Sequence, residues 1–303
     1  MSSMSDLRRR IKGINNTKQI TKAMNLVASA KLTKARKRFD DNKLFFEGVK
    51  RVISSLVKDN RSNCSHFFNQ RQVDSIAIIV ISGDKGLCAG YNNNVNKLAF
   101  ELQYDKAKSF ITIGAKSKEF FRHKGSNIIS SYKDMSENPD YEDAYHIANE
   151  AIELYTNGEV DEVYLVHTRF ISALSNEPNA IRLLPVNKAQ FIDNDDNKSH
   201  IKSNNKSDEN ESDINNSQTI SIYEPDEETV LNDIIPRYIN AIIFNAILES
   251  AVCELSARMT AMNTASENAS DAIDKLSLVY NSLRQGAVTQ EITEIVGGSN
   301  ALE

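Results

Sequence analysis

Cysteine is scarce in this sequence, and its pattern excludes two classes of protein. Cys64, Cys88 and Cys253 lie far apart among the 303 residues and are odd in number. This spacing fits neither a disulfide framework nor a metal-binding cluster. The histidines show no paired spacing of the kind that metal sites use. We therefore expect a reducing, cytoplasm-like compartment and no metal ion.

Long apolar runs are also missing. A membrane-spanning helix needs about 18 or more apolar residues in a row, whereas the densest stretch, Ile76 to Ile81, is only strand-sized. The N-terminus lacks the apolar core of a signal peptide. We therefore expect no export, and any membrane association should be indirect.

Glycine and proline are rare at the two ends of the chain. From Leu7 to about Leu56 there is no proline, and apolar or small residues recur every three or four positions. The first series is Leu7, Ile11, Ile14, Thr21, Ala28, Leu32, Ala35 and Phe39. The C-terminal series is Tyr238, Ile242, Leu248, Val252, Leu255, Met259, Met262, Ser266, Ala269, Ile273, Leu276, Tyr280, Leu283 and Ala287, interrupted by polar Asn245.

These two series predict long helices that pack against each other. Several heptads in register demand a partner helix, and the other end of the same chain is the obvious one. Small residues such as Ala28 and Ala269 would allow a close antiparallel approach. Glu224-Pro225-Asp226 is a plausible helix start, and Pro236 is expected to kink or restart the helix.

The middle of the chain has a different pattern. Strands are predicted at Val73–Ile81, Phe110–Ile113, Asn127–Ser131 and Val160–Phe170, and helices at Asn92–Leu102, Lys116–His123 and Tyr141–Tyr155. Alternating strands and helices predict a parallel-type sheet covered by helices. Residues 193–217 are rich in Asn, Asp, Ser and Lys, which indicates a solvated insertion outside the core.

The predicted fold class is therefore α/β, with a long antiparallel coiled coil of the N- and C-terminal helices and a central Rossmann-like domain. We expect four segments: the N-terminal coiled-coil helix at 1–60, the central α/β domain at 61–190, a polar insertion at 191–222 and the C-terminal coiled-coil helix at 223–303.

A glycine-rich loop, Ser82–Gly90, follows the first predicted strand, where a phosphate-binding loop would lie. Its glycines miss the dinucleotide-binding register, and no Gly-Lys-Ser/Thr follows, so a sharp strand-to-helix turn is favoured. Cys88 has no acid or histidine nearby in sequence to make it a nucleophile. Glu150 and Glu153 are explained most simply as the solvated face of a helix.

Charge is unevenly distributed, although the net charge is only −5. The first predicted helix is strongly basic and includes Lys34-Ala35-Arg36-Lys37-Arg38, which predicts an acidic neighbour. No aromatic residues interleave with these cations as in base-stacking surfaces, so acidic loops of a partner protein are favoured over nucleic acid.

Five motifs in order resemble those of the γ subunit of the F1 sector of ATP synthase. They are Asn15–Lys31 (NNTKQITKAMNLVASAK), Ser82–Gly90 (SGDKGLCAG), Tyr223–Asp226 (YEPD), Ala257–Met262 (ARMTAM) and Gln290–Gly298 (QEITEIVGG). The resemblance spans nearly the whole chain. It implies a non-catalytic central-stalk rotor of a proton-translocating F1Fo complex, with no cofactor of its own.

The resemblance also implies partners and contact residues. The partners are the α and β subunits in an α3β3 hexamer, the ε subunit and the ring of c subunits, with no nucleic acid and with membrane contact only through the complex. The implied contacts with catalytic subunits are Lys22, Met24, Lys31, Arg258, Arg284, Gln285, Thr289 and Glu291. Tyr223 and Glu224 are the implied contacts with the membrane ring.

The polar stretch 193–217 departs from the family pattern because it is longer than usual, and no cysteine pair for thiol switching occurs there. Few residues precede the first motif, so no organellar transit peptide is expected. This favours a bacterial protein attached peripherally to the cytoplasmic side of the cell membrane. Two alternatives stay open: an α/β enzyme with a ligand pocket at Gly83–Gly90, and a coiled-coil adaptor that binds nucleic acid.

Overall fold

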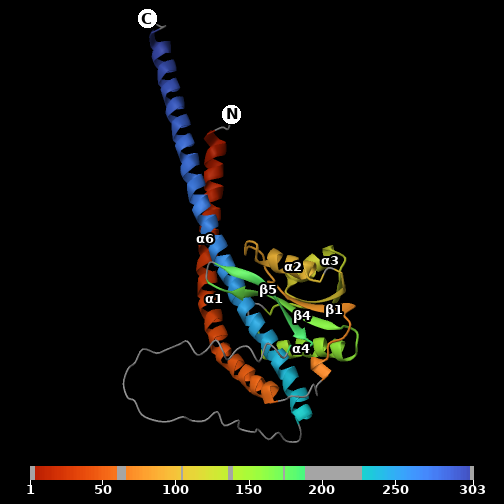
Figure 1. The fold of residues 1–303 in the computed structure, drawn as a ribbon. Helices are drawn as coiled ribbons and strands as arrows, with labels where there is room; N and C mark the ends of the chain where they lie inside the picture. The colour runs from red at the N-terminus through yellow and green to blue at the C-terminus, as the bar shows by residue number, and fades with distance from the viewer. Residues whose placement is uncertain are drawn as a thin grey trace, which may run out of the picture. The chain divides into compact units, whose positions relative to one another are not determined.

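The computed structural model describes residues 4–59, 66–103, 105–135, 139–172, 175–187 and 227–300. The elements run in the order α1 (Met4–Asp59), a short 3-10 turn (His66–Phe68), β1 (Ser75–Ile81), α2 (Tyr91–Glu101), β2 (Ala107–Ile113), α3 (Ala115–His123), β3 (Asn127–Tyr132), α4 (Tyr141–Thr156), β4 (Glu162–Phe170), β5 (Asn176–Leu184) and α6 (Glu227–Asn300) (Figure 1). The predicted segment 193–217 lies outside the described residues.

The chain divides into two compact units, which are described separately. The helical unit contains Met1–Thr33, Leu87–Ala89 and Leu255–Glu303. The α/β unit contains Lys34–Gly86 and Gly90–Glu254. Both α1 and α6 contribute residues to each unit, since neither helix is interrupted.

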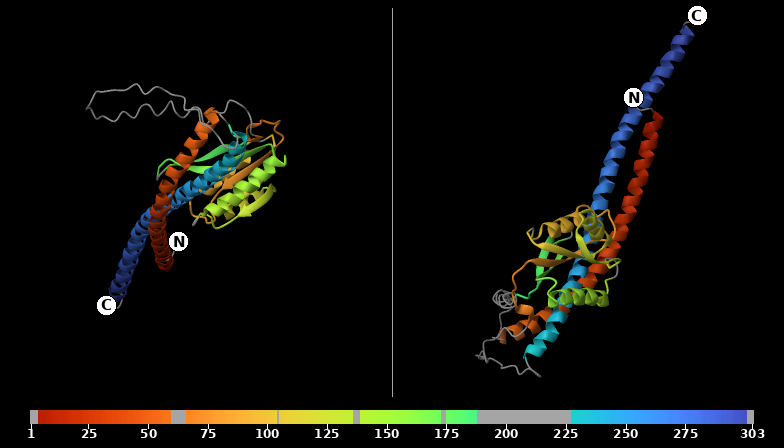
Figure 2. Two further views of the ribbon diagram at one scale, coloured as in Figure 1. Left: turned by 90° about the horizontal axis from the view of Figure 1, so that it is seen from below. Right: turned by 90° about the vertical axis from the view of Figure 1, so that its right-hand side faces the viewer.

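In the helical unit the N-terminal part of α1 runs antiparallel to the C-terminal part of α6 (Figures 1 and 2). Lys18 Nζ donates to Ser270 Oγ at 3.0 Å, and Asn25 Nδ2 donates to the Met259 carbonyl at 2.9 Å. The order of these contacts reverses along α6, as an antiparallel pair requires. The predicted pairing of the two ends is therefore confirmed in this unit.

The predicted apolar series forms the contact in the helical unit. Leu7, Thr21 and Ala28 of α1 are buried, as are Met262 and Ala269 of α6. Burial of the small residues permits the close approach of the two backbones that the sequence predicts. One member departs from the prediction, since Leu283 is 43% exposed.

The α/β unit is built on a five-stranded sheet with the order β3-β2-β1-β4-β5. Strands β1 to β4 are mutually parallel, whereas β5 pairs antiparallel with β4. The sequence predicted the four parallel strands and missed β5. Strand β1 lies in the middle, and its near-continuous apolar sequence SIAIIVI reflects burial on both faces of the sheet.

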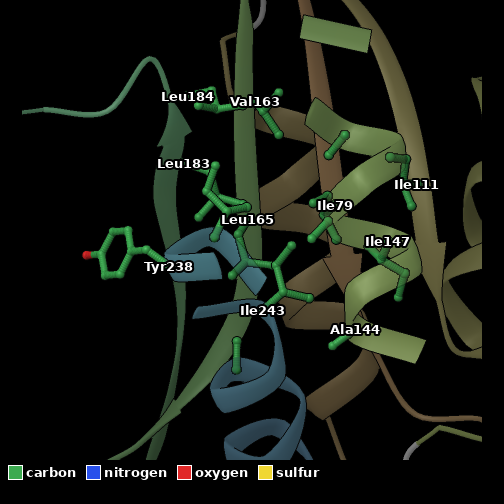
Figure 3. Packing of buried hydrophobic residues seen from close by; sticks show 14 of the residues in the cluster. Ile79, Ile111, Ala144, Ile147, Val163, Leu165, Leu183, Leu184, Tyr238 and Ile243 are labelled. Carbon is green, nitrogen blue, oxygen red and sulfur yellow. The ribbon is translucent and has the colours of Figure 1, made fainter. Parts of the chain in front are cut away.

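Alternate residues of β1 enter two different cores. Ile76, Ile78 and Val80 pack with residues of α2 and α3. Ala77, Ile79 and Ile81 face the other side, where α4, α6 and Ile53 of α1 pack. Figure 3 shows part of this second core, in which Ile147 of α4 and Ile243 of α6 point toward the strands. Each large aliphatic side chain buried here contributes about 1.5–3 kcal/mol.

Helix α6 differs in two ways from what the sequence predicts. Of the two expected effects of Pro236, a kink or a restart, the restart is wrong, because α6 runs unbroken through this residue; the neighbours Ile235, Tyr238 and Ile239 are buried in the core and stabilise this turn. It also contains a stretch long and apolar enough to cross a membrane by length and composition alone, contrary to expectation. Since 72% of that stretch is buried inside the protein, packing against the sheet accounts for its apolar character.

Candidate functional site

The glycine-rich loop is held by hydrogen bonds within the α/β unit. Gly83 N donates to Asn92 Oδ1 at 2.8 Å, and Asn92 Nδ2 donates to the Lys85 carbonyl at 3.3 Å. Asp84 Oδ1 accepts from the first amide of α3, at Ala115, and its Oδ2 accepts from Asp134 N. The carboxylate of Asp84 thus occupies the helix N-terminus where a bound anion would lie, which agrees with a structural turn.

The space at the carboxyl end of β1 is filled by α6. In open α/β sheets a ligand enters a crevice at this edge. Here Ser82 and Tyr91 line a cavity of about 10 Å³ together with Ser250 and Glu254 of α6. That volume holds about one water molecule, so this cavity does not provide the ligand pocket that the enzyme alternative predicts.

Other candidate chemical groups have structural surroundings. Cys88 and Cys253 are buried free thiols, and burial raises the pKa of the Cys253 thiol, which disfavours the reactive thiolate. Among the described residues, no three His, Cys, Asp or Glu side chains are grouped to hold a metal ion.

Glu150 is half-buried and hydrogen-bonded to a neighbouring strand, whereas the sequence interpretation placed it on the solvated face of its helix. Its Oε2 accepts from Ser130 Oγ at 2.7 Å and from Tyr132 Oη at 2.9 Å, which joins α4 to β3. Burial, with this hydrogen bond as the second cause, raises the pKa of Tyr132 to about 12. Glu153, by contrast, is exposed as expected.

Most basic residues of α1 in the helical unit are exposed, whereas Lys18 is half-buried and donates to Ser270 of α6. Lys22 and Lys31 are exposed and Met24 is half-buried, whereas Thr21 and Ala28 face α6. Arg8, Arg9, Arg10 and Lys12 are likewise exposed. One helix face therefore packs within the chain and another presents positive charge to solvent.

The C-terminal part of α6 extends past the start of α1 (Figures 1 and 2). Fourteen residues separate Met4, the first residue of α1, from Lys18, and fourteen separate Ser270 from Arg284. This count places Met4 opposite Arg284, and the same count of 21 positions from Asn25 and Met259 places it opposite Tyr280. Beyond Arg284 no described residue of α1 remains to cover α6, and Leu283 is exposed because it lies at this end of the helix pair.

This free stretch of α6 carries the remaining candidate residues. Arg284, Gln285, Thr289 and Glu291 are exposed, and Arg258 further back is half-buried. Thr289 Oγ1 donates to the Gln285 carbonyl at 2.9 Å, as threonines often do on a helix surface. Apolar side chains are interspersed in this stretch and exposed, namely Val288, Ile292, Ile295 and Val296, and Leu278, Val279 and Leu283 just before it are exposed as well. Tyr223 and Glu224 lie outside the described residues.

Contiguous exposed apolar side chains on a helix indicate a protein interface. Ile295 is 72% exposed and Ile292 is 56% exposed, although a helix facing only water carries polar residues on all sides. Together with the basic surface of α1, the free stretch of α6 gives the helical unit two distinct surfaces for partner proteins.

Sequence reasoning missed a polar cluster in the α/β unit. Glu249 and Glu254 of α6 are directed into the protein, where Glu249 Oε2 lies 3.3 Å from His167 Nε2 and Glu254 is 4% exposed. The available signal was two glutamates five residues apart within the apolar stretch ILESAVCELSA.

Comparison with known proteins agrees with this geometry. A family profile described as ATP synthase matches residues 3–302. A protein of Acetobacterium woodii named "ATP synthase gamma chain, sodium ion specific" is 38% identical over 302 residues, 99% of each chain. An "ATP synthase gamma chain" of Alkaliphilus metalliredigens is 39% identical over 301 residues, again 99% of each chain.

Solved structures share the fold. A chain from the rotor of Euglena gracilis mitochondrial ATP synthase aligns with a TM-score of 0.66 at 16% identity, over 94% of this chain and 98% of that one. A second structure of the Euglena enzyme, described as OSCP/F1/c-ring, gives 0.65 at 17% identity, over 99% and 94% of the two chains.

Proposed function

The chain belongs to the family of ATP synthase γ chains, and we propose that it turns as the central shaft inside a ring of catalytic subunits. In this role it couples rotation of a membrane ring to ATP synthesis and hydrolysis. The γ chain is not itself catalytic; the complex carries the activity. The observation that carries the proposal is the free stretch of α6 after Arg284, whose exposed apolar side chains require a surrounding protein.

We assign the contacts with catalytic subunits to both surfaces of the helical unit. Lys22, Met24 and Lys31 of α1 would face acidic loops, since the exposed face of this helix is basic. On α6 the contacts would be made by Arg258, Arg284, Gln285, Thr289 and Glu291. We propose that these residues contact the α and β subunits of an α3β3 hexamer.

We propose that the membrane ring is contacted by residues that lie close in sequence to the α/β unit, outside the helical unit. We propose that Tyr223 and Glu224 contact the ring of c subunits and that the ε subunit completes the central stalk. The complex is membrane-associated, and we propose that this chain lies on the cytoplasmic face of a bacterial membrane without entering the bilayer.

The proposed mechanism depends on asymmetry. A two-helix shaft presents a different side to each of three catalytic subunits and stabilises a different nucleotide affinity in each, so rotation exchanges the three states. A shaft that turns inside a bearing needs weak contacts. Exposed ion pairs are suitable, because each contributes only about 0 to 1 kcal/mol.

The test uses the whole complex purified through an affinity tag on this chain. We expect α and β subunits to co-purify in a 3:3:1 ratio with it. Recovery of the chain without them, together with nucleotide turnover by the isolated chain, would support the enzyme alternative instead. Salt-sensitive binding to DNA or RNA would support the adaptor alternative.

A sharper test concerns the free stretch of α6. Deletion of residues 290–303 is expected to leave the α/β unit folded and to weaken the coupling between ion flow and ATP turnover. Ile292→Asp should act in the same direction, because it places a charge in the proposed interface. Ile171→Asp is the matched control, since Ile171 is similarly exposed, at 51%, but belongs to the α/β unit. Unchanged coupling in the deletion and in Ile292→Asp would refute the assignment.

A further inference from the structure

The contacts of α6 with the sheet change character along the helix. Its residues in the α/β unit from Leu231 to Ile247 enter the apolar core. The next turn and a half makes polar contacts instead: Glu249 and Cys253 form hydrogen bonds through their side chains, Ser250 accepts one at its backbone carbonyl, and the buried carboxyl group of Glu254 packs against Gly83. We call these four residues and their partners (Tyr91, Gly83, His167, Thr168, Phe170 and Asn176) the polar collar.

One side of the collar is bound to the end of β4 and the start of β5. Glu249 Oε1 accepts from Phe170 N at 3.0 Å, and Glu249 Oε2 lies 3.3 Å from His167 Nε2. One turn further on, Cys253 Sγ donates to the Thr168 carbonyl at 3.4 Å. Asn176 Nδ2 donates to the Cys253 carbonyl, also at 3.4 Å.

The other side of the collar meets α2 and the glycine-rich loop. Tyr91 Oη donates to the Ser250 carbonyl at 3.1 Å. The Glu254 carboxyl group lies so close to Gly83 that a Cβ atom on residue 83 would come within 2.6 Å of Glu254 Cδ. Only glycine fits at position 83 without displacing this buried side chain.

These contacts hold α6 from two directions. Residues 249 and 253 are four apart and share one face of the helix, as do residues 250 and 254. The two faces are about 100° apart, since each residue advances the helix by that angle. A turn of α6 about its own axis would therefore break the contacts on both sides at once.

Directional contacts are what a shaft needs at the point where torque enters it. Apolar packing is non-directional, so a smooth helix can turn or slide against an apolar sheet. Hydrogen bonds weaken steeply when their angle is distorted, and buried groups that lose their partners are costly. We propose that the polar collar is a torsional lock, which transmits torque between the α/β unit and α6. This inference rests on the rotor function proposed above.

The test compares two double variants in the assembled complex. Glu249→Ala with Tyr91→Phe removes one carboxylate and one tyrosine hydroxyl from the collar. Glu150→Ala with Tyr132→Phe removes the same two kinds of group from the contact between α4 and β3, which does not involve α6. The second pair is the matched control for loss of stability in the α/β unit.

The measurements are ATP hydrolysis, ATP-driven ion pumping and the torsional stiffness of single complexes with the probe attached to the α/β unit. We expect the collar variant to hydrolyse ATP at close to the unaltered rate. Its stiffness and its ions pumped per ATP should each fall by at least about two-fold, while the control changes neither. A loss of stiffness equal to that in the control would overturn the proposal.

Two further outcomes are informative. If the collar double variant does not assemble, Tyr91→Phe alone decides, because it removes one hydroxyl and keeps the ring; it should lower stiffness, and unaltered stiffness would count against the lock. If the unaltered chain itself fails to co-purify with α and β subunits, the rotor function is refuted, which separates that failure from failure of the collar.

Discussion

Asn25 of α1 donates a hydrogen bond from Nδ2 to the backbone carbonyl of Met259 on α6, at 2.9 Å. The Met259 carbonyl lies inside a continuous helix, so this bond joins a side chain of one helix to the backbone of the other. Lys18 and Ser270 make a second polar contact further along the pair. Two such contacts within the apolar series favour one register of the helices, because a shifted register would leave half-buried polar groups unpaired.

Replacement of Asn25 by alanine should loosen the helical unit. A net hydrogen bond contributes about 1 kcal/mol, so amide exchange in residues 18–33 should speed up by about five-fold relative to the unaltered chain. Asn15→Ala is the matched control, since Asn15 is exposed on the same helix. Hydrogen-exchange mass spectrometry of the full-length chain measures both, and equal exchange in the two variants would contradict the role of Asn25.

Gly83→Ala tests the closest approach in the polar collar. The new methyl group would collide with the Glu254 carboxyl, and overpacking of this kind costs about 1–3 kcal/mol. Gly86→Ala is the control, because nothing lies within 4 Å of the position its Cβ would take. Urea unfolding of the full-length chain followed by tyrosine fluorescence provides the measurement.

The double variant Gly83→Ala/Glu254→Ala tests whether collision with Glu254 causes the loss of stability in Gly83→Ala. Truncation of Glu254 removes the colliding atoms, so Gly83→Ala should cost markedly less in this background than in the unaltered chain. The two substitutions should thus be non-additive by about 1 kcal/mol or more. Strict additivity would show that the loop backbone, and not Glu254, requires glycine at position 83.

The helices and strands that were predicted correctly are those whose hydrophobic pattern is determined by residues within the element itself. The 3,4-spaced series of α1 and α6 and the apolar run of β1 each follow from the period of their own element. Strand β5 was missed because its sequence, NEPNAIRLL, contains proline and four polar residues. Proline is tolerated at the edge of a sheet, and the edge position of β5 follows from its pairing with β4 alone.

The polar collar could not be predicted for a different reason. An acidic residue on a helix usually faces solvent, so Glu249 and Glu254 were not distinguished from solvated residues. Their partners are His167 and Phe170 for Glu249 and Gly83 for Glu254, which are remote in sequence. Only the packing of α6 across the sheet brings them together.

The exposure of Leu283 could not be predicted either, because it depends on which residue of α1 lies opposite it in the folded helix pair.

The hydrogen bond between Tyr132 and Glu150 predicts a pH dependence of stability. Burial raises the pKa of Tyr132 to about 12 in the folded chain, whereas an unperturbed tyrosine titrates near 10. The folded state thus retains the phenolic proton more tightly than the unfolded state. The stabilisation is fully present below about pH 10 and is lost as the pH rises from about 10 through about 12.

Tyr132→Phe should therefore destabilise the full-length chain by about 1 kcal/mol near neutral pH, because Glu150 loses one hydrogen-bond donor. The difference in free energy of unfolding between the unaltered chain and the variant should shrink as the pH is raised through that window. Tyr238, whose pKa is also raised to about 12 by burial, is present in both chains and cancels from the difference. Tyr145→Phe is the control, since Tyr145 is exposed on α4. Urea midpoints at a series of pH values provide the comparison, and a difference for Tyr132→Phe that stays constant up to about pH 12 would contradict the proposed titration.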